Sequence, residues 1–599
     1  MKPTLAFDME VYTNYTLLLF KTVGEPTLVY PFELFNQTEG LDEFQLDGLR
    51  TLVTSHRLIT FNGNGYDIPL LHLALRGEPS TKIKYASDRI IVQGLKWWNF
   101  EKEFNVNLHE GMIDTIDLMD VAPLTGSLKN YAAKMHSKSI QDLPLAPSAL
   151  IQEDQLPLMR AYCEHDLDST TDLFRCLEQP LALREAMSVQ YGVDLRSKSD
   201  AQIAEAVIKA EVEKITGRKL EKPGHSPGDK FKYQVPSWMG FTMTDILPAI
   251  SQADFVVTDT GGVLMPDELR LRKIGIGAGV YRMGIGGLHS SEKKQIAQAD
   301  ESYMLIDFDV VSYYPSILLN QRLYPQHIGP VFLEVYQGIV NARLAAKKIK
   351  ARKSDAESLK ITINGTFGKL GSKWSALYSP DLMIQVTVTG QLALLMLIET
   401  LADLVGVEVM SANTDGVTIR CLRESEAEAV AATKVWEART GFELERADYA
   451  ALYNRDVNSY IAVKTNGEVK TKGEYGAGLP LHKTPAGHIC STAVIEYLTK
   501  GTPIVETIGR CTDVREFICA RRVTGGAVWR GQEIGRIVRW IYSTQETEAF
   551  TYKVSKITVP KTLGAFPLVT LPDQIPDHLD YQWYIDEAAS MLDDLGVTI

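Results

Sequence analysis

The 599-residue chain has only six cysteines, and no two of them stand in a Cys-x-x-Cys spacing. That pattern argues against a zinc site built from cysteine pairs and against a disulfide framework, and it favours reduced thiols. A positive net charge is lacking as well, since the formal charge is −13. This value argues against a protein that coats nucleic acid nonspecifically, although local basic tracts can still bind phosphates.

Long apolar runs, internal repeats and low-complexity tracts are also lacking. No apolar run reaches the length that we expect of a membrane-spanning helix, and the first residues carry no signal-peptide core. The apolar share of 45% is enough for sizeable hydrophobic cores, and the length predicts several domains. We therefore expect a soluble, intracellular, multidomain protein with no membrane association.

Two acidic segments far apart in the chain organise the sequence. Asp309 follows an apolar run at 303–306, which predicts a buried strand, and Asp415 lies in a turn between two apolar segments, which predicts a hairpin. Carboxylates at strand ends and turns can share two divalent cations, which stabilise both oxygens of an in-line phosphoryl displacement. Asp307 is on the same strand face as Asp309. We expect a solvated carboxylate there, with a third acidic ligand as the alternative.

A second set of carboxylates lies in the first 175 residues. Asp8 and Glu10 are two apart on a predicted strand, so they point to one face, and a solvated strand face is the alternative role. Asp67 follows a glycine-rich turn at the start of a predicted helix. The alternative to a role in the site is that Asp67 merely caps this helix. Tyr162 and Asp166 are four apart on another predicted helix and share a face, whereas Asp168 points elsewhere.

The order D-x-E, N-x-x-x-[FY]-D and Y-x-x-x-D resembles the three exonuclease motifs of the 3′–5′ proofreading domain in family B DNA polymerases. The resemblance implies that four carboxylates bind two metal ions, that Tyr162 orients the attacking water, and that Asn62 contacts DNA. Asp117 matches a further acidic position of the family. The implied metal ligands are Asp8, Glu10, Asp67 and Asp166.

The segment Asp309-Val-Val-Ser-Tyr-Tyr-Pro-Ser316 resembles motif A of the same family, and Asn413-Thr-Asp-Gly416 resembles its motif C, D-T-D-S. The family's first motif C aspartate is Asn413 here, which removes one negative charge and favours weaker metal binding. The resemblance implies that Tyr314 excludes a 2′-hydroxyl, because a ring packed under C2′ leaves no room for it. The implied metal-binding positions are Asp309, Val310 and Asp415, and the implied nucleotide-binding positions are Val310, Ser312, Tyr313 and Tyr314.

The segment 360–368 resembles motif B, K-x-x-x-N-S-x-Y-G, with Gly365 in place of Ser and Phe367 in place of Tyr. It lies on the second of two predicted antiparallel helices, which we expect to join near 353–355. The resemblance implies that Arg343, Lys347 and Lys360 bind the β- and γ-phosphates, and that Asn364 and Phe367 flank the nascent base pair. An exposed helix face is the alternative role for such cations.

Three further segments are expected to contact DNA. Gly286 and Gly287 lie where the family has a Y-x-G-G element that touches the template, with a glycine here at the tyrosine position. Lys470, Lys472 and Tyr475 lie on the second strand of a predicted hairpin, which resembles the family's K-x-Y region near primer phosphates. The tract 521–561 is rich in Arg and Lys, which suits a thumb that grips duplex DNA.

The resemblance implies an α/β (α+β) multidomain fold, with an RNase H-like exonuclease followed by a right-hand polymerase. We also expect a long apolar helix over about 390–405, stopped by Gly406. The expected domains are the exonuclease (1–175), a connecting region (176–298), the palm (299–330 and 374–478), the fingers (331–373) and the thumb (479–599).

The expected function is template-directed DNA polymerisation with 3′–5′ proofreading, in the replication of DNA by a compact enzyme of the type found in bacteriophages. Two Mg²⁺ ions are expected in each active site, with Mn²⁺ as an alternative. The expected partners are primer–template DNA and deoxynucleoside triphosphates, and a single-strand-binding protein or a clamp is left open. We expect a monomer in the cytoplasm of a bacterial host.

Three alternatives remain open. The first is a 3′–5′ exonuclease with a weakened polymerase site, which Asn413 suggests. The second is a protein-primed replicase, which the short segment between Asp309 and Lys360 disfavours because it leaves no room for an extra subdomain. The third is a non-enzymatic DNA-binding scaffold, which the two carboxylate sets and the acidic net charge disfavour.

Overall fold

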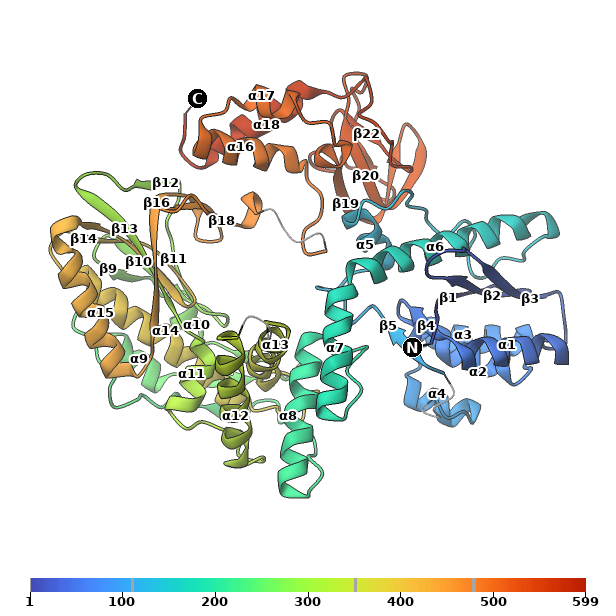
Figure 1. Ribbon diagram of the computed structural model, residues 1–599, viewed down its shortest axis with the longest axis horizontal. Coiled ribbons are helices and arrows are strands. Elements are labelled where there is room, and N and C mark those ends of the chain that lie inside the picture. The colour runs from blue at the N-terminus through green and yellow to red at the C-terminus, as the bar shows by residue number, and fades with distance from the viewer. Residues whose placement is uncertain (1, 109–112, 350–352, 477–480, 599) are drawn as a thin grey trace.

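The computed structural model describes residues 2–108, 113–349, 353–476 and 481–598. Over these residues the chain has a mixed α/β, multidomain architecture, with sheets of five, ten, four and three strands. The N-terminal region (2–176), the central region (274–476) and the C-terminal region (481–598) are each built on one of the three larger sheets, and α7 and α8 lie between the first two (Figure 1).

The N-terminal region is built on the sheet β3-β2-β1-β4-β5, in which β1 pairs antiparallel with β2 and parallel with β4. Leu5, Phe7 and Met9 of β1 pack with α1 to α4 on one face. Asp8 and Glu10 alternate with them and therefore point to the face covered by α5 and α6. The elements are β1 (Thr4–Val11), β2 (Tyr15–Thr22), β3 (Val29–Phe35), α1 (Glu43–Ser55), β4 (Arg57–Thr60), η1 (Gly63–Gly65), α2 (Asp67–Leu75), α3 (Ser80–Ile91), α4 (Trp97–Phe104), β5 (Thr115–Asp117), α5 (Leu128–Lys134), η2 (Glu153–Gln155) and α6 (Leu156–Cys176).

The segment between the N-terminal and central regions is mainly helical and ends in a small sheet, β6-β7-β8. Ser199 caps α8 by accepting a hydrogen bond from the backbone N–H of Gln202, which completes a capping box. The elements are α7 (Glu178–Tyr191), α8 (Asp200–Thr216), β6 (Lys230–Phe231), α9 (Ile246–Gln252), β7 (Phe255–Val257), β8 (Val263–Leu264) and α10 (Asp267–Arg270).

The central region is built on the ten-stranded sheet, and β13 lies within it between β15 and β16. Ile306 and Phe308 of β13 face the helical layer, so Asp307 and Asp309 point to the opposite face. The elements are β9 (Ile274–Ile276), β10 (Gly279–Met283), β11 (Leu288–Ser290), β12 (Gln295–Gln298), β13 (Tyr303–Val310), α11 (Tyr313–Asn320), α12 (Val331–Lys347), α13 (Lys353–Leu370), α14 (Pro380–Ala402), β14 (Val407–Asn413), β15 (Gly416–Leu422), η4 (Arg423–Ser425), α15 (Glu426–Thr440), β16 (Leu444–Asp456), β17 (Ser459–Lys464), β18 (Val469–Lys472) and η5 (Gly473–Tyr475).

The apolar helix expected over about 390–405 is α14, and both expected ends were wrong. The helix begins ten residues earlier with Pro380 in its first turn, and Asp403, not Gly406, follows its last residue. By its length and composition α14 could cross a membrane, whereas we expected no apolar run of that length. Its mean hydropathy is 1.6 over a window that is 83% buried. It is apolar on all sides because it lies inside the core of the central region.

The two expected antiparallel helices are α12 and α13, and α8 packs against both. Residues 353–355, near which we expected the join, instead form the first turn of α13, and 350–352 lie outside the described residues. Gly365 explains how α8 approaches α13 so closely. A Cβ at Gly365 would lie 2.7 Å from the Ala204 Cβ and 2.9 Å from the Asp200 carbonyl oxygen, so the family's serine does not fit here.

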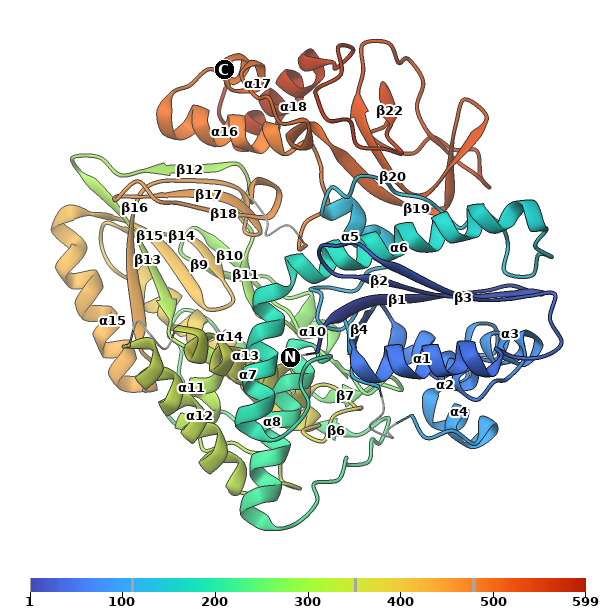
Figure 2. The same ribbon diagram turned by 45° about the vertical axis from the view of Figure 1, so that its right-hand side comes forward.

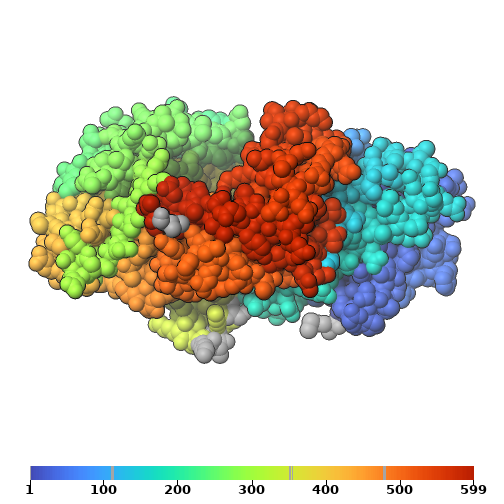
Figure 3. Space-filling model, turned by 90° about the horizontal axis from the view of Figure 1, so that it is seen from above, coloured from blue at the N-terminus to red at the C-terminus, as the bar shows by residue number. Residues whose placement is uncertain are grey.

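The C-terminal region combines the sheet β21-β19-β20-β22 with three helices around a core of its own. Seen from above, it lies between the central and N-terminal regions (Figure 3). The expected boundary at 478–479 falls outside the described residues. The elements are α16 (His488–Lys500), α17 (Ile504–Gly509), η6 (Val514–Phe517), β19 (Cys519–Trp529), β20 (Gln532–Tyr542), β21 (Thr551–Tyr552), β22 (Ala565–Pro567) and α18 (Tyr581–Asp594).

Candidate active sites

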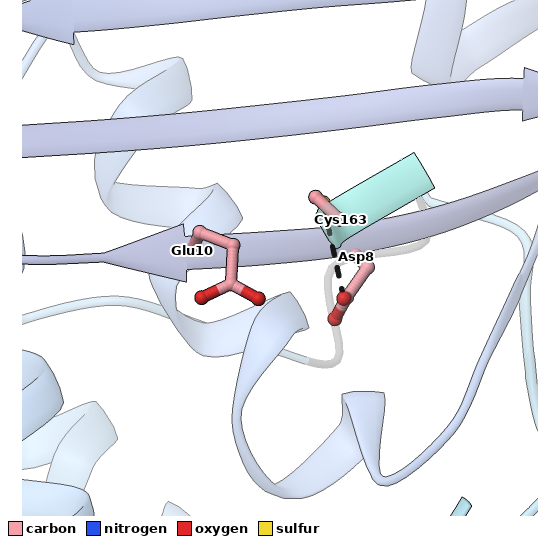
Figure 4. Close-up of side chains that lie close together, drawn as sticks. All are labelled: Asp8, Glu10 and Cys163. Carbon is pink, nitrogen blue, oxygen red and sulfur yellow. Dashed lines mark hydrogen bonds between the residues drawn. The ribbon is translucent and has the colours of Figure 1, made fainter. Parts of the chain in front are cut away.

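The N-terminal carboxylates come together from β1, α2 and α6. Asp8 and Glu10 lie on the same side of β1, with Cys163 of α6 beside Asp8 (Figure 4). Asp67 is 3% exposed, and its carboxylate accepts a hydrogen bond of 3.2 Å from the backbone N–H of Met9. It makes no N-cap bond, since Tyr66 precedes the helix without a side-chain cap, so the capping alternative was wrong.

Burial and mutual repulsion raise the pKa values of this cluster. Burial, followed by the carboxylate of Asp166, raises the pKa of Asp8 to about 7. Burial and then Asp8 raise the pKa of both Glu10 and Asp67 well above the ordinary values. Burial also raises the pKa of Asp166, while the Lys129 ammonium opposes that rise. Without a cation, these raised pKa values favour protonated carboxyl groups, and a divalent cation, which prefers oxygen ligands, would instead stabilise the charged carboxylates.

Lys129 is a site residue that the sequence did not reveal. It lies on α5, and its ammonium donates a hydrogen bond of 3.0 Å to the hydroxyl of Tyr162. Burial and then Asp166 raise the pKa of Tyr162, so this hydroxyl stays protonated. Ser127, two residues before Lys129, caps α5 by accepting a hydrogen bond from the backbone N–H of Asn130.

The neighbouring acidic residues are engaged elsewhere. As expected from helix geometry, Asp168 points away from the cluster and pairs with Lys21 at 2.6 Å. Asp117 is buried and accepts hydrogen bonds from the backbone N–H groups of Asn62 and Asn64. Asp117 therefore shapes the turn before Asp67, and it holds Asn62 in a left-handed conformation with an exposed side chain.

The central carboxylates meet where β13 ends beside the β14–β15 turn. The backbone N–H of Val310 donates a hydrogen bond of 2.8 Å to the carbonyl oxygen of Asp415. Gly416 is paired with Asp309, and a Cβ there would lie 2.2 Å from the Asp309 carboxylate, so the turn needs glycine at this position. The two carboxylates line a cleft of about 400 Å³ that also contains Lys470 and Lys472.

Asp307 is not the solvated carboxylate that we expected. It is 6% exposed and accepts hydrogen bonds of 2.6 Å from the Thr418 hydroxyl and 2.5 Å from the Tyr449 hydroxyl. The ammonium of Lys470 lies 3.5 Å from Asp307 and 3.6 Å from Asp309. Lys470 is therefore held by this acidic site, and the buried carboxylate of Asp307 is one of the two groups that hold it.

Burial and charge set the protonation of this site too. Burial, followed by Asp307, raises the pKa of Asp309 to about 6. Burial raises the pKa of Asp415 as well. Burial alone would lower the pKa of Lys470, but the carboxylates of Asp307 and Asp309 raise it, so Lys470 stays charged.

The side-chain amide of Asn413 makes two hydrogen bonds within the protein. Its Nδ2 donates a hydrogen bond of 3.0 Å to the carbonyl oxygen of Val457, in the turn that joins β16 and β17. Its Oδ1 accepts a hydrogen bond from the Thr414 hydroxyl. An aspartate could make the second contact but not the first, because a carboxylate has no N–H group to donate.

Several predicted nucleotide-binding residues come together beside the central site. Arg343 of α12 donates a hydrogen bond of 3.3 Å to the Ser312 hydroxyl. The ring of Tyr314 stacks on Phe367 at 4.2 Å, and its hydroxyl donates to the Gly286 carbonyl oxygen. The predicted contact residues Lys347 of α12 and Lys360 and Asn364 of α13 have exposed side chains.

Two predicted contact residues have buried side chains, which contradicts a direct role for those side chains. Tyr313 is 4% exposed and donates its hydroxyl hydrogen to the Gly390 carbonyl oxygen. Tyr475 is fully buried, and its hydroxyl donates to the carbonyl oxygen of Met591. Both rings fill hydrophobic cores instead. Gly287 lies against Thr414, whose Oγ1 would be 2.8 Å from an added Cβ.

No protein-family model matches the chain, and no curated protein matches it. Among solved structures, the chain is similar to the family B DNA polymerase of the hyperthermophilic archaeon Pyrobaculum calidifontis, with 14% sequence identity and a TM-score of 0.39. The match covers 99% of this chain and 77% of that chain. A likeness this distant carries no argument about function, which rests on the residues of the two sites.

Proposed function

We propose that the chain is a template-directed DNA polymerase with a 3′–5′ exonuclease, the first acting at the central cluster and the second at the N-terminal cluster. The observation that supports this most is that motifs scattered along the sequence converge into two separate carboxylate clusters. In the N-terminal cluster the backbone N–H of Met9 donates to the Asp67 carboxylate, and in the central cluster that of Val310 donates to the Asp415 carbonyl oxygen. A chance set of short acidic motifs has no reason to converge in this way.

In this proposal the domains are those expected from the sequence. The N-terminal region is the exonuclease, and the sheet β3-β2-β1-β4-β5 supports an RNase H-like fold for it. The ten-stranded sheet is the palm, α12 and α13 are the fingers, and the C-terminal region is the thumb. The bacteriophage origin, the monomeric state, the cytoplasmic location and any clamp or single-strand-binding partner rest on the resemblance alone and stay predictions.

At the central site, Arg343 and Ser312 would hold the triphosphate, together with Lys347 and Lys360. The Tyr314 ring, fixed between Phe367 and Gly286, would lie under the sugar and reject a 2′-hydroxyl. Bound Mg²⁺ or Mn²⁺ would supply the positive charge that stabilises the attacking 3′-oxygen and the leaving pyrophosphate. Asp309 and Asp415 would hold these ions.

At the N-terminal site, Asp8, Glu10, Asp67 and Asp166 would hold the metal ions. The Tyr162 hydroxyl, which stays protonated beside Lys129, would donate or accept the hydrogen bond that orients the attacking water. The phosphodiester next to the 3′-end of a DNA strand would then be cleaved to release a nucleotide.

The direct test uses a 5′-labelled primer annealed to a longer template, with Mg²⁺ and with or without deoxynucleotides. We expect lengthening with nucleotides and shortening without them, and no lengthening with ribonucleotides. Shortening under both conditions would favour the alternative, an exonuclease with an inactive polymerase site. If neither occurs, the proposed function is wrong.

A further inference from the structure

Backbone hydrogen bonds join the N-terminal and C-terminal regions at an interface. We call this interface, which includes residues 137–140 and 569–571, the seam. The backbone N–H of Ile140 donates to the Val569 carbonyl oxygen at 3.1 Å, and that of Leu571 donates to the Lys138 carbonyl oxygen at 2.7 Å. The buried guanidinium of Arg539 donates to the Ser137 carbonyl oxygen at 2.6 Å. Residues 137–140 are therefore attached to the C-terminal region as if they were one of its own strands.

The helix that carries Lys129 belongs to the same seam. Ala132 and Ala133 of α5 pack with Ile140, Ala520 and Ile537 in a small apolar cluster that joins the two regions. Figures 1 and 2 both place α5 next to β19 and β20. A movement of the C-terminal region would therefore act directly on α5.

Asp142 links this seam to the N-terminal carboxylate cluster. One oxygen of its carboxylate accepts a hydrogen bond of 3.0 Å from the backbone N–H of Arg536 in β20. The other oxygen lies 3.6 Å from the ammonium of Lys129, which donates to Tyr162. Gly535 makes room for this contact, since a Cβ there would lie 2.7 Å from the Asp142 carboxylate.

We propose that Asp142 is a positioning residue through which the C-terminal region holds Lys129 at the edge of the N-terminal carboxylate cluster. The inference rests on the proposed exonuclease function of that cluster. A lysine ammonium is a mobile charge on a flexible stem, so its position depends on the anions around it. Besides Asp142, the acidic neighbours that act on Lys129 are Glu10 and Asp166.

The direction of the effect follows from this arrangement. Asp142 attracts Lys129 outward, toward β20, whereas Glu10 and Asp166 attract it inward, to the place where divalent cations would bind. If Asp142 loses its charge or is displaced, Lys129 moves inward and competes with those cations. More metal is then needed for the same hydrolysis.

The test compares two variants that disturb Asp142 from opposite sides of the seam. Asp142→Asn removes the charge, and Gly535→Ala adds a methyl group against the carboxylate without changing any charge. Both should raise the Mg²⁺ concentration for half-maximal hydrolysis of a single-stranded oligonucleotide by about two- to fivefold, the range of a partly exposed ion pair. Both should also raise the Mn²⁺ concentration that half-saturates the thermal shift, a readout that needs no catalysis.

Two variants serve as matched controls. Gly531→Ala changes another glycine of the same hairpin that has a positive φ, of 79° against 93° for Gly535, but no heavy atom lies within 4 Å of its added Cβ. Asp573→Asn removes a different ion pair across the seam, the 2.5 Å contact with Lys138. Both should keep the wild-type metal dependence. In a Lys129→Gln background, Asp142→Asn should have no further effect on metal dependence.

An unchanged metal dependence in both Asp142→Asn and Gly535→Ala would overturn the proposal. An equal shift in the two controls would also overturn it, because the seam would then act only as a structural support. If the wild-type protein does not shorten the oligonucleotide at all, the proposed function fails instead. The Mn²⁺ thermal shift would still decide whether Asp142 controls Lys129.

Discussion

The amide of Asn413 donates a hydrogen bond of 3.0 Å to the carbonyl oxygen of Val457, which connects the β14–β15 turn to the β16–β17 turn. We predict that Asn413→Asp, which restores the charge of the family motif, lowers the free energy of unfolding by about 1–3 kcal/mol. The aspartate leaves the Val457 carbonyl without its donor and adds a negative charge beside Asp309 and Asp415. Urea unfolding followed by tryptophan fluorescence measures the change.

Asn466→Asp is the matched control for this prediction. The Asn466 side chain accepts a hydrogen bond from the backbone N–H of Glu468 through its carbonyl oxygen, a contact that aspartate can keep. This variant should therefore unfold like the wild-type protein. If the Asn413→Asp variant is at least as stable as the wild type, the hydrogen bond to Val457 does not explain why the chain has asparagine at position 413.

The second prediction concerns the contact between α8 and α13. Gly365→Ser, which restores the family residue, should lower the free energy of unfolding by about 1–3 kcal/mol, because its Cβ would meet the Asp200 backbone and the Ala204 side chain. At Gly368 on the same helix an added Cβ meets no heavy atom within 4 Å beyond its own helical backbone, so Gly368→Ser should be neutral or slightly stabilising. Equal stability of the two variants, measured by thermal unfolding, would contradict the close packing of α8 on α13.

The third prediction concerns pH and the seam. Burial, then the positive charges of Arg539 and Arg515, lower the pKa of His136 to about 4. The unfolded state therefore binds more protons than the folded state between about pH 6.5 and 4, so the stability contribution of His136 is lost as the pH falls through that window. His136→Asn, which tolerates the positive φ of 55° at this position, should gain stability relative to the wild type on acidification, by an amount on the order of 1 kcal/mol.

Stability curves of the two proteins at pH 7, 6, 5 and 4 test this expectation. Substitution of His482, which is exposed, provides the control. A difference between His136→Asn and the wild type that stays constant over this range would show that His136 does not contribute to acid sensitivity.

The fourth prediction concerns metal ions at the N-terminal cluster. Burial and then the Asp8 carboxylate raise the pKa of Glu10, so its contribution to stability is lost as the pH rises through that raised value. Glu10→Gln should therefore raise the melting temperature of the metal-free protein at pH 8 by about 2–4 °C, and the gain should shrink at lower pH. Mg²⁺ should stabilise the wild type more than this variant. Calorimetry with and without a chelator measures both effects.

Glu164→Gln is the control for the Glu10 prediction, because Glu164 lies on α6 and pairs with Lys21 outside the cluster. Its response to Mg²⁺ should match that of the wild type. If Mg²⁺ stabilises the Glu10→Gln variant as much as the wild type, Glu10 is not a metal ligand.

The elements that carry the motifs were predictable because their signals are local. The apolar run at 303–306 marks β13, and Ser127 and Ser199 each cap a helix through a backbone N–H only three positions away. The spacing of Asp166 and Asp168 on α6 was enough to predict that only one of the two can join the cluster. Such patterns depend only on the geometry of one strand or one helix.

The burial of particular side chains was not predictable, because their partners come from distant segments. Asp307 is enclosed by Thr418, Tyr449 and Lys470, which lie on three other strands. Lys129 reaches Tyr162 only because α5 packs beside α6. The limits of α14 were missed for another reason, since a helix that is apolar on all sides has no periodicity to mark its start.

In the proposed function the two carboxylate clusters catalyse opposite reactions on the 3′-end of DNA. The most direct measurement is an assay of the wild type, Glu10→Gln and Asp415→Asn on one 5′-labelled primer–template with Mg²⁺, with and without deoxynucleotides. We predict that Glu10→Gln lengthens the primer but no longer shortens it, and that Asp415→Asn shortens the primer but no longer lengthens it. Loss of both reactions in either folded variant, or continued lengthening by Asp415→Asn, would contradict the account.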